Sequence, residues 1–412
     1  MEGYNKKVIM SYWTICRMKT TKKIYVKVSI IFLLGGILLF SSCEKEENQK
    51  IEANRKTLFM YLPWSSNLTN YFYNNISDLE KCITKIGLNN EKVIVFISTG
   101  STEAMMFEIV SSHGRCKREI LKKYKSPPFT TIDGITAILN DVKAFAPASV
   151  YTMIIGCHGM GWLPVYEMKV RSAPHMKMHW EYQGVPLTRY FGGLTAEYQT
   201  DIKSLASGIA NAGMKMEYIL FDDCYMSSIE VAYELKDVTK YLIGSTSEMM
   251  AYGMPYATVG EFLLGNPDYG SLCEGFHDFY STYEIMPCGT LAVTDCSELE
   301  NMAAIIKSIN SKYSFDKSLR GTIQRLDGYT PVIFYDFADY ITSLCNDPIL
   351  LNQFREQLNH LVPYKTHTKN FYTMAKGIIP INTFSGITTS DPSDNPMTVL
   401  KENTLWYKAA HN

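Results

Sequence analysis

The chain is 412 residues long, more than one average domain needs, and 46% of its residues are apolar. With 20% charged residues, this composition allows a large buried core and excludes a disordered or fibrous protein. The 40 Lys and Arg residues balance the 41 Asp and Glu residues, so no overall positive field marks nucleic acid as a partner.

The first 42 residues predict a secretory signal peptide. A segment rich in Lys and ending at Lys27 precedes an uncharged, mainly apolar stretch at 28–40, and small residues follow it. This order is typical of a signal sequence, and the stretch is shorter than the roughly 20 residues that a membrane-spanning helix needs. Met18, followed directly by Lys19, offers a second translation start with an ordinary basic beginning.

The end of the leader, Ser41-Ser42-Cys43, resembles the lipobox of bacterial lipoproteins. The resemblance implies that Cys43 is lipidated and becomes the mature N-terminus, with residues 43–56 as a polar tether. The acidic segment 44–47 resembles the tag of surface-exposed Bacteroidetes lipoproteins. Together these features imply export, attachment to the outer membrane through the lipid anchor alone, and exposure at the cell surface. A plain cleaved signal or an uncleaved anchor is the alternative.

The cysteines after Cys43 predict no metal site and no disulfide framework. None forms a C-x-x-C pair or a zinc-finger spacing with histidine. Disulfides are permitted outside the cytoplasm, but in so apolar a chain we expect most of these thiols to be buried small side chains. They are Cys82, Cys116, Cys157, Cys224, Cys273, Cys288, Cys296 and Cys345.

Alternating patterns along the chain predict an α/β fold. Short apolar runs rich in β-branched and aromatic residues predict strands at 57–62, 93–98, 149–156, 218–221, 241–245 and 290–293. Helical periodicity predicts helices at 66–87, 132–145, 201–212, 227–236 and 297–310. This alternation predicts a mostly parallel sheet covered by helices on both faces.

Two regions break the alternation. Residues 166–193 form a long, basic segment without periodicity, and long loops inside compact domains tend to be functional. The last 90 residues contain a predicted strand at 332–335, a predicted helix at 350–361 and a Pro- and Ser-containing loop at 390–396. Residues 321–412 belong either to the same sheet or to a smaller C-terminal subregion.

Chemistry is concentrated where two predicted strands end. The 149–156 strand runs into Cys157-His158-Gly159, and the 218–221 strand runs into Asp222-Asp223-Cys224. The carboxyl ends of parallel strands share one edge of a sheet, so His158 and Cys224 are expected to lie side by side. A thiolate is a reactive nucleophile and a nearby imidazole can move protons. The backbone N–H groups of Gly159 and Cys224 are candidates for an oxyanion hole.

The two blocks, His-Gly-x-Gly-Trp from His158 and Phe-Asp-x-Cys-x-Met around Cys224, resemble the clostripain-like cysteine peptidases of the caspase/gingipain/legumain superfamily. Flanking segments at 56–62, 241–245 and 252–256 resemble the same family. The resemblance implies a caspase-like three-layer α/β/α sandwich over residues 57–406, with the C-terminal part packed on it. It implies a cysteine endopeptidase that acts on proteins or peptides.

Carried over by position, His158 matches the catalytic histidine and Cys224 matches the nucleophile. Asp222 matches the acidic residue at the floor of the pocket for the residue before the scissile bond, which implies cleavage after Arg or Lys. The chain departs from many relatives at Tyr252, where an acidic residue commonly reinforces that pocket. Glu248 is a candidate substitute.

Family members often mature by cutting themselves after a basic residue that follows the catalytic histidine. The 166–193 segment is in that position, and the alternative is a solvated surface loop. No organic cofactor is expected, and no acidic cluster has a calcium-loop spacing, so calcium dependence stays open. The candidate cut sites are Lys169, Arg171, Lys177 and Arg189.

Other interpretations of the same residues remain. An inactive surface lipoprotein would use the cleft to bind peptides or glycans, and a transpeptidase would share the acyl-enzyme and differ in its acceptor. Cys157 would switch the enzyme off by pairing with Cys224, and Asp222 and Asp223 would only cap the helix that follows. His175 and His179 lie behind Pro174 in the basic loop and predict no metal site. We expect a monomer.

Overall fold

The computed structural model describes residues 54–65, 67–165, 184–185 and 198–411. The predicted signal peptide, Cys43, and the four candidate cut sites Lys169, Arg171, Lys177 and Arg189 lie outside these ranges. In the described part of the chain, no helix combines the length and the apolar character that crossing a membrane requires.

Within the described residues, nine strands form one sheet in the order β10-β8-β7-β6-β5-β1-β2-β3-β4. The five central strands, β7 to β2 in this order, are parallel, and antiparallel strands extend the sheet at both edges. The strands are β1 (Asn54–Leu62), β2 (Glu91–Ser98), β3 (Glu103–Ser112), β4 (Arg115–Lys125), β5 (Ala148–Ile155), β6 (Met216–Phe221), β7 (Thr239–Gly244), β8 (Thr290–Asp295) and β10 (Tyr364–His367).

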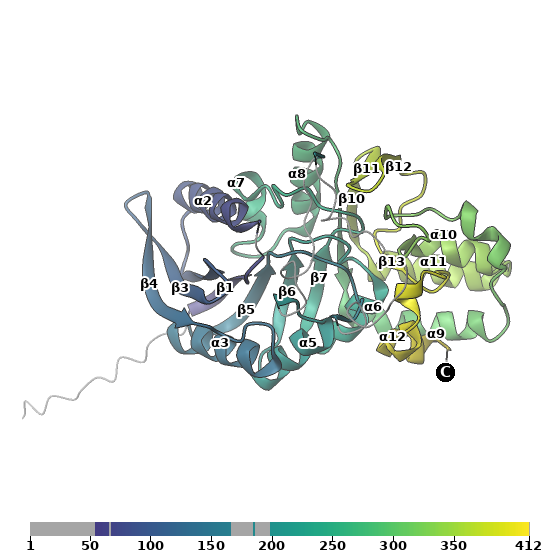
Figure 1. Ribbon diagram of the computed structural model, residues 1–412, viewed down its shortest axis with the longest axis horizontal. Helices are drawn as coiled ribbons and strands as arrows, with labels where there is room; N and C mark the ends of the chain where they lie inside the picture. The colour runs from purple at the N-terminus through teal and green to yellow at the C-terminus, as the bar shows by residue number, and fades with distance from the viewer. Residues whose placement is uncertain (1–53, 66, 166–183, 186–197, 412) are drawn as a thin grey trace, which may run out of the picture. The chain divides into compact units, whose positions relative to one another are not determined.

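Helices cover both faces of this sheet (Figure 1). On one face, α7 (Tyr256–Val259) packs against α2 (Thr69–Ile86) and α8 (Tyr269–Ser281). On the other face, a continuous row of contacts joins α3 (Ile132–Phe145), α5 (Ile202–Asn211), α6 (Ile229–Leu235), α12 (Leu405–His411), α9 (Leu299–Asn310) and α11 (Pro348–Leu361). The predicted three-layer α/β/α sandwich is confirmed.

Local sequence explains where several helices begin. The Thr131 side chain accepts the Gly134 N–H at the start of α3, and Asp201 accepts the Ser204 N–H at the start of α5. Asp347 accepts backbone N–H groups at the start of α11, whose first residue is Pro348. These side chains satisfy donors that a helix leaves unpaired in its first turn. The predicted bounds of these three helices are therefore within two residues of the observed ones.

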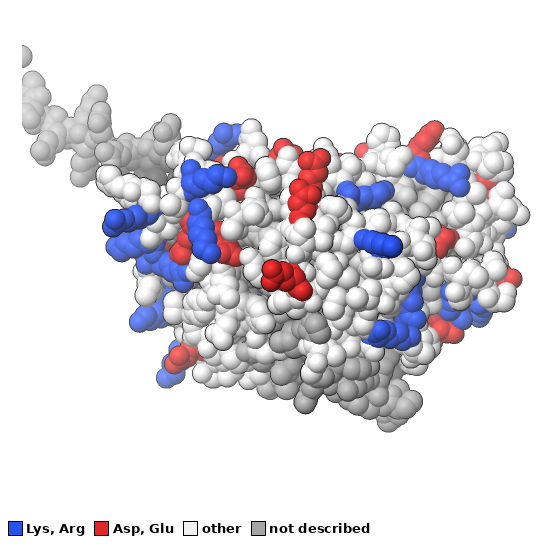
Figure 2. Space-filling view, turned by 90° about the horizontal axis from the view of Figure 1, so that it is seen from above, with Lys and Arg blue, Asp and Glu red and all other residues white. Residues whose placement is uncertain are grey.

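The sequence patterns missed the hairpin of β3 and β4. Side chains along β4 are exposed or half-buried, so the strand lacks the buried face that makes alternation visible. It is an edge strand of the sheet, and Lys and Arg gather at this end of the molecule (Figure 2). Charged side chains on an edge strand oppose pairing with another chain.

The C-terminal part contributes to the main sheet and to smaller elements. β10 pairs with β8 and so forms one edge of the sheet. The predicted strand at 332–335 is wrong in extent, because only β9 (Tyr335–Asp336) is a strand there, and it pairs with β13 (Thr388–Thr389). The remaining elements are α10 (Phe337–Leu344), a hairpin of β11 (Asn370–Thr373) and β12 (Gly377–Pro380), and 3-10 turns at Gly260–Phe262, Cys296–Glu298, Lys317–Thr322, Pro396–Thr398 and Lys401–Asn403.

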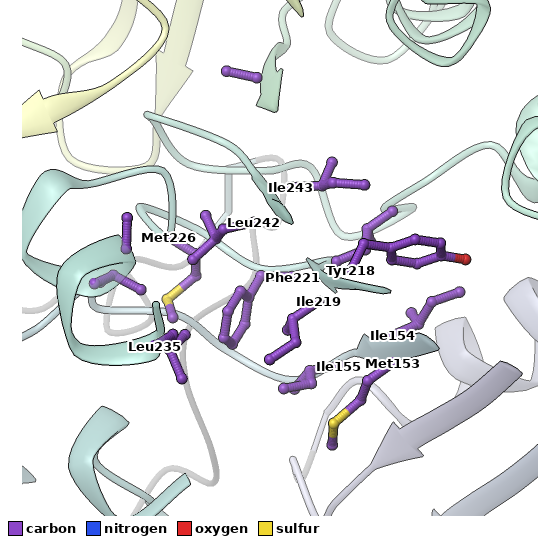
Figure 3. Packing of buried hydrophobic residues seen from close by; sticks show 14 of the residues in the cluster. Met153, Ile154, Ile155, Tyr218, Ile219, Phe221, Met226, Leu235, Leu242 and Ile243 are labelled. Atoms are coloured by element: carbon purple, nitrogen blue, oxygen red, sulfur yellow. The ribbon is translucent and has the colours of Figure 1, made fainter. Parts of the chain in front are cut away.

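The core lies between the sheet and its helices. Apolar side chains from β5, β6 and β7 pack together around Ile155, Phe221 and Leu242, each at most 1% exposed (Figure 3). The carboxyl-terminal halves of these strands are buried on both faces, which is why they read as continuous apolar runs. Their packing fixes the strand ends from which the chemical groups project.

Candidate active site

The register of β5 and β6 places the two chemical blocks next to each other. Ile155 pairs with Phe221 in the parallel ladder, and the Asp222 N–H donates to the Ile155 carbonyl over 2.8 Å. His158 and Cys224 each lie three residues beyond this pair. His158 and Cys224 therefore follow the ends of two neighbouring strands, β5 and β6, as predicted.

Gly159 brings the two turns into direct contact. A Cβ atom at Gly159 would lie 2.0 Å from the Cys224 carbonyl oxygen and 2.9 Å from its backbone nitrogen. No side chain fits in such a space, so the close approach requires glycine at this position. The backbone after the histidine therefore lies against the backbone of the nucleophile candidate.

Asp223 connects the same two turns through its side chain. One carboxylate oxygen accepts the Cys157 N–H over 2.6 Å, and the other lies 3.4 Å from the Cys157 thiol sulfur. The cap of α6 is instead Ser228, which accepts the Val231 N–H. The interpretation of Asp223 as a helix cap is wrong, because its carboxylate faces the neighbouring strand end. It orients the residue that precedes His158.

The His158 ring is contacted from the end of β1. Its Nε2 lies 3.0 Å from Oδ1 of Asn67, an exposed residue just before α2, while the His158 side chain is fully buried. The strand β1 pairs with β5 in parallel, so residues after β1 lie beside residues after β5. Asn67 was not predicted, although a polar residue shortly after the 57–62 strand was the available signal.

The Cys224 sulfur receives a backbone hydrogen bond. The Met249 N–H donates to Sγ over 3.1 Å from the segment that follows β7, and Cys224 is fully buried. An N–H donor stabilises a thiolate relative to a thiol. Nothing in the local sequence around Met249 marks it for this role, because its contribution is a backbone group.

Tyr225, next to the nucleophile candidate, has a left-handed backbone with φ +63°. This conformation costs a bulky residue roughly 1–3 kcal/mol, so it persists only where the surrounding contacts impose it. Here the Tyr225 N–H donates to the Ser247 carbonyl over 3.0 Å, and the ring stacks on Phe334 with centroids 4.9 Å apart. The sharp turn at Cys224 is therefore held by distant segments.

Asp222 is almost fully buried, at 1% exposed, and holds the 252–256 loop. Its two oxygens accept the Met254 N–H and the Tyr256 hydroxyl, both over 2.9 Å. Tyr252 of the same loop donates its hydroxyl to Asp78 of α2 over 2.8 Å. A second carboxylate, that of Asp78, is thus linked to this loop through Tyr252, and it was not predicted from the sequence.

Glu248, the candidate substitute for the acidic residue of the pocket, contacts two distant segments of the chain. It is 3% exposed, and its carboxylate accepts the Tyr225 hydroxyl over 2.8 Å and the Met374 N–H over 3.0 Å. The first of these contacts directs Glu248 toward the turn at Cys224 and Tyr225, the nucleophile turn.

The remaining described thiols are buried, except that of Cys116, which is half-buried. All eight described cysteines are free, so Cys157 and Cys224 do not form a disulfide. Burial raises the pKa of Cys82 and Cys288 to about 11 and the pKa of Cys273 and Cys296 to about 12. Such thiols remain protonated and unreactive near neutral pH. Among the described residues, no group of three or more His, Cys, Asp or Glu side chains is arranged to hold a metal ion.

Comparison with known proteins agrees with this geometry. The model of the clostripain family matches residues 60–391. A secreted C11 cysteine protease from Bacteroides thetaiotaomicron is 58% identical over 87% of this chain and 99% of its own, with a TM-score of 0.81. A clostripain from the same organism, in complex with the peptide inhibitor BTN-VLTK-AOMK, is 64% identical over 54% of this chain and 99% of its own, with a TM-score of 0.53.

An inactive zymogen C11 protease from Parabacteroides distasonis shares the fold at 24% identity, over 87% of this chain and 98% of its own, with a TM-score of 0.71. A search of curated proteins found no match. The matched region spans most of the chain and contains both strand ends described above. The chain belongs to the clostripain family of cysteine proteases.

Proposed function

We propose that this clostripain-family protease is an exported endopeptidase that cleaves after Lys or Arg, with Cys224 as nucleophile and His158 as general acid and base. The observation that carries the proposal is the contact between the two strand ends, where a Cβ at Gly159 would lie 2.0 Å from the Cys224 carbonyl oxygen. This contact joins the histidine and cysteine turns into one site.

The reaction follows from these groups. The Cys224 thiolate attacks the scissile carbonyl carbon, the carbon–nitrogen bond breaks, and His158 protonates the leaving amine. Water then attacks the thioester carbonyl while His158 accepts its proton, the carbon–sulfur bond breaks, and the carboxylic acid product leaves the Cys224 thiolate beside protonated His158. The N–H groups of Gly159 and Cys224 stabilise the oxyanion. These steps need no organic cofactor, and calcium is a variable to be tested.

Specificity for a basic residue is supported by the position of Asp222, which follows β6 two residues before Cys224 and matches the acidic residue of the family's pocket. A carboxylate in a partly dry pocket attracts a Lys or Arg side chain by charge and hydrogen bonding. The clostripain from B. thetaiotaomicron, 64% identical, is in complex with the peptide inhibitor BTN-VLTK-AOMK, in which the sequence VLTK ends in Lys. By this likeness we infer the same substrate class for this chain.

Self-activation is supported by burial. His158 and Cys224 are both 0% exposed, so a substrate reaches them only after the surrounding chain moves. Cleavage after Lys169, Arg171, Lys177 or Arg189 would cut the chain shortly after the histidine turn. The segment that contains these four residues would then be a substrate of the enzyme itself.

Export through the leader and lipidation at Cys43 complete the proposal. The relative from B. thetaiotaomicron at 58% identity is described as secreted, which supports export. Labelling with a radioactive fatty acid in cells tests the anchor, since the wild type should carry the label and Cys43→Ala should lose it.

The enzymatic test uses the chain from residue 44 onward and fluorogenic peptides ending in Arg, Lys or Ala, with calcium and a reductant as variables. We expect hydrolysis after Arg and Lys that Cys224→Ala abolishes, while Cys116→Ala, which changes a half-buried thiol on β4, retains it. Fragments from the 166–193 segment should appear only when Cys224 is present.

Each result has one meaning. Equal cleavage after Ala would remove the role of Asp222 in specificity, and activity in Cys224→Ala would overturn the mechanism. If the wild type hydrolysed none of the peptides under any condition, the inactive lipoprotein that binds peptides or glycans would be favoured.

A further inference from the structure

The segment that follows β7, Ser247–Met249, contacts the nucleophile turn at three consecutive residues. The Ser247 carbonyl accepts the Tyr225 N–H, the Glu248 carboxylate accepts the Tyr225 hydroxyl, and the Met249 N–H donates to Cys224 Sγ. All the residues involved are at most 3% exposed. The segment and the turn are therefore fixed to each other in the core.

We propose that Glu248 is a positioning residue that holds the Met249 N–H on the Cys224 sulfur by fixing Tyr225. The carboxylate connects two parts of the chain that are distant in sequence, since its second oxygen accepts the Met374 N–H from the turn between β11 and β12. It thereby locks the backbone of its own neighbour, Met249. The proposal deepens the proposed function, because it rests on Cys224 as the nucleophile.

Local geometry supports a positioning role for the pair of Tyr225 and Glu248. Tyr225 has a positive φ, a conformation that side chains rarely adopt, and its hydroxyl and ring are both engaged, with Glu248 and with Phe334. Loss of the hydroxyl contact frees the turn to relax toward ordinary backbone angles. Relaxation would move Cys224 away from the Met249 N–H.

The test compares three variants with the wild type. Tyr225→Phe removes only the hydroxyl, and Glu248→Gln removes the charge while keeping the size of the side chain. Tyr233→Phe is the control for removal of a tyrosine hydroxyl, because Tyr233 of α6 donates to the carboxylate of Glu300, a largely exposed residue, over 2.9 Å. The hydroxyl of Tyr233 is directed to α9 and has no contact with the nucleophile turn.

Three measurements are made on each variant: kcat and KM for peptides ending in Lys, the rate at which iodoacetamide labels Cys224 in the self-processed protein, and hydrogen exchange in peptides covering 247–250. We expect Tyr225→Phe and Glu248→Gln each to lower kcat and the labelling rate about tenfold, with KM within about twofold of wild type. Exchange at the Met249 amide should accelerate in both. The double variant should be no worse than the more affected single variant, because both act through one contact.

If Glu248 acted through its charge, Glu248→Gln would raise the rate of Cys224 labelling and not lower it. Removal of a nearby negative charge stabilises a thiolate, so faster labelling in Glu248→Gln than in wild type would overturn the positioning role. Unchanged exchange at Met249 in Tyr225→Phe, or equal losses in the Tyr233→Phe control, would also overturn it. Exchange needs neither substrate nor access to the thiol, so it decides the matter even if the wild type proves inactive and the proposed function fails.

Discussion

The two strand ends that form the site are held in different ways. The cysteine turn is surrounded by segments distant in sequence: Ser247–Met249 after β7, Phe334, and the Gly386 carbonyl, which accepts the Ser227 hydroxyl. The histidine turn is oriented by Asp223 on its inner side and by the exposed Asn67 at the ring.

This difference matches what the two groups do in the proposed reaction. A nucleophile must be fixed against the carbonyl it attacks, because small displacements cost much of the rate. A group that protonates the leaving amine and then activates water serves two positions in turn. We therefore expect changes around the cysteine turn to be costly for both stability and rate, and changes around the histidine ring to act mainly on rate.

The largest effect is expected where the two turns meet. Gly159→Ala would place a Cβ 2.0 Å from the Cys224 carbonyl oxygen, so the two backbones must separate. We expect a loss of about 2–3 kcal/mol of stability and at least about 100-fold in kcat/KM, measured by denaturation and peptide hydrolysis. Gly100→Ala is the control, since no atom lies within 4 Å of its Cβ. Wild-type activity in Gly159→Ala would contradict the close contact.

The helix that follows the cysteine turn, α6, can be tested through the pH dependence of stability. Its buried residue Glu230 is the titrating group. Its carboxylate accepts the Ser390 N–H and the Thr389 hydroxyl, and burial, followed by the charge of Asp391, raises its pKa from 4.5 to about 7. The folded state then binds a proton more tightly than the unfolded state, so this group stabilises the fold below about pH 4.5 and loses that contribution as the pH rises to about 7.

The expected size of this change is about 3 kcal/mol on the wild type. Glu230→Gln stays neutral at every pH, so its stability should not share the decline. Urea denaturation at pH 4.5, 6 and 7.5 measures the difference between the two proteins. Parallel pH profiles for both would show that Glu230 does not titrate in this range.

The histidine turn is tested by changing Asp223, whose buried carboxylate accepts the Cys157 N–H. Asp223→Ala leaves the Cys157 N–H without this acceptor in the core, which should cost about 2 kcal/mol of stability and displace His158, so that kcat falls. Asp223→Asn keeps an acceptor oxygen and should recover most of the stability. Equal stability of Asp223→Ala and wild type by thermal denaturation would argue that the carboxylate does not hold this turn.

The smallest effect is expected at Asn67. Asn67→Ala removes an exposed partner of the His158 ring, so stability should change by less than about 0.5 kcal/mol. We expect kcat to fall a few-fold with KM unchanged, because the ring loses a contact that orients it. Asn70→Ala, an exposed change in the first turn of α2, is the control. A change in stability as large as that of Asp223→Ala would abolish the contrast between the inner and outer contacts of the histidine turn.

Much of the fold was predictable from the sequence alone. Buried parallel strands appear as continuous apolar runs, and helices are indicated by their capping residues and their apolar periodicity. The strand ends that bear His158 and Cys224 were predictable for the same reason, together with the family resemblance. The 269–281 helix and the β3–β4 hairpin were not predicted, and β4 shows why: its polar side chains on both faces leave no periodic signal.

The tertiary structure decided what surrounds the two turns. Asp223 read as a helix cap in the sequence, yet its carboxylate reaches Cys157, which is 66 residues away. Glu248 joins Tyr225 to Met374, and Met249 acts through a backbone N–H that every residue except proline carries. Local patterns record which residues a segment contains, whereas hydrogen bonds between distant segments depend on how the sheet brings strand ends together, and for that physical reason only the folded chain shows them.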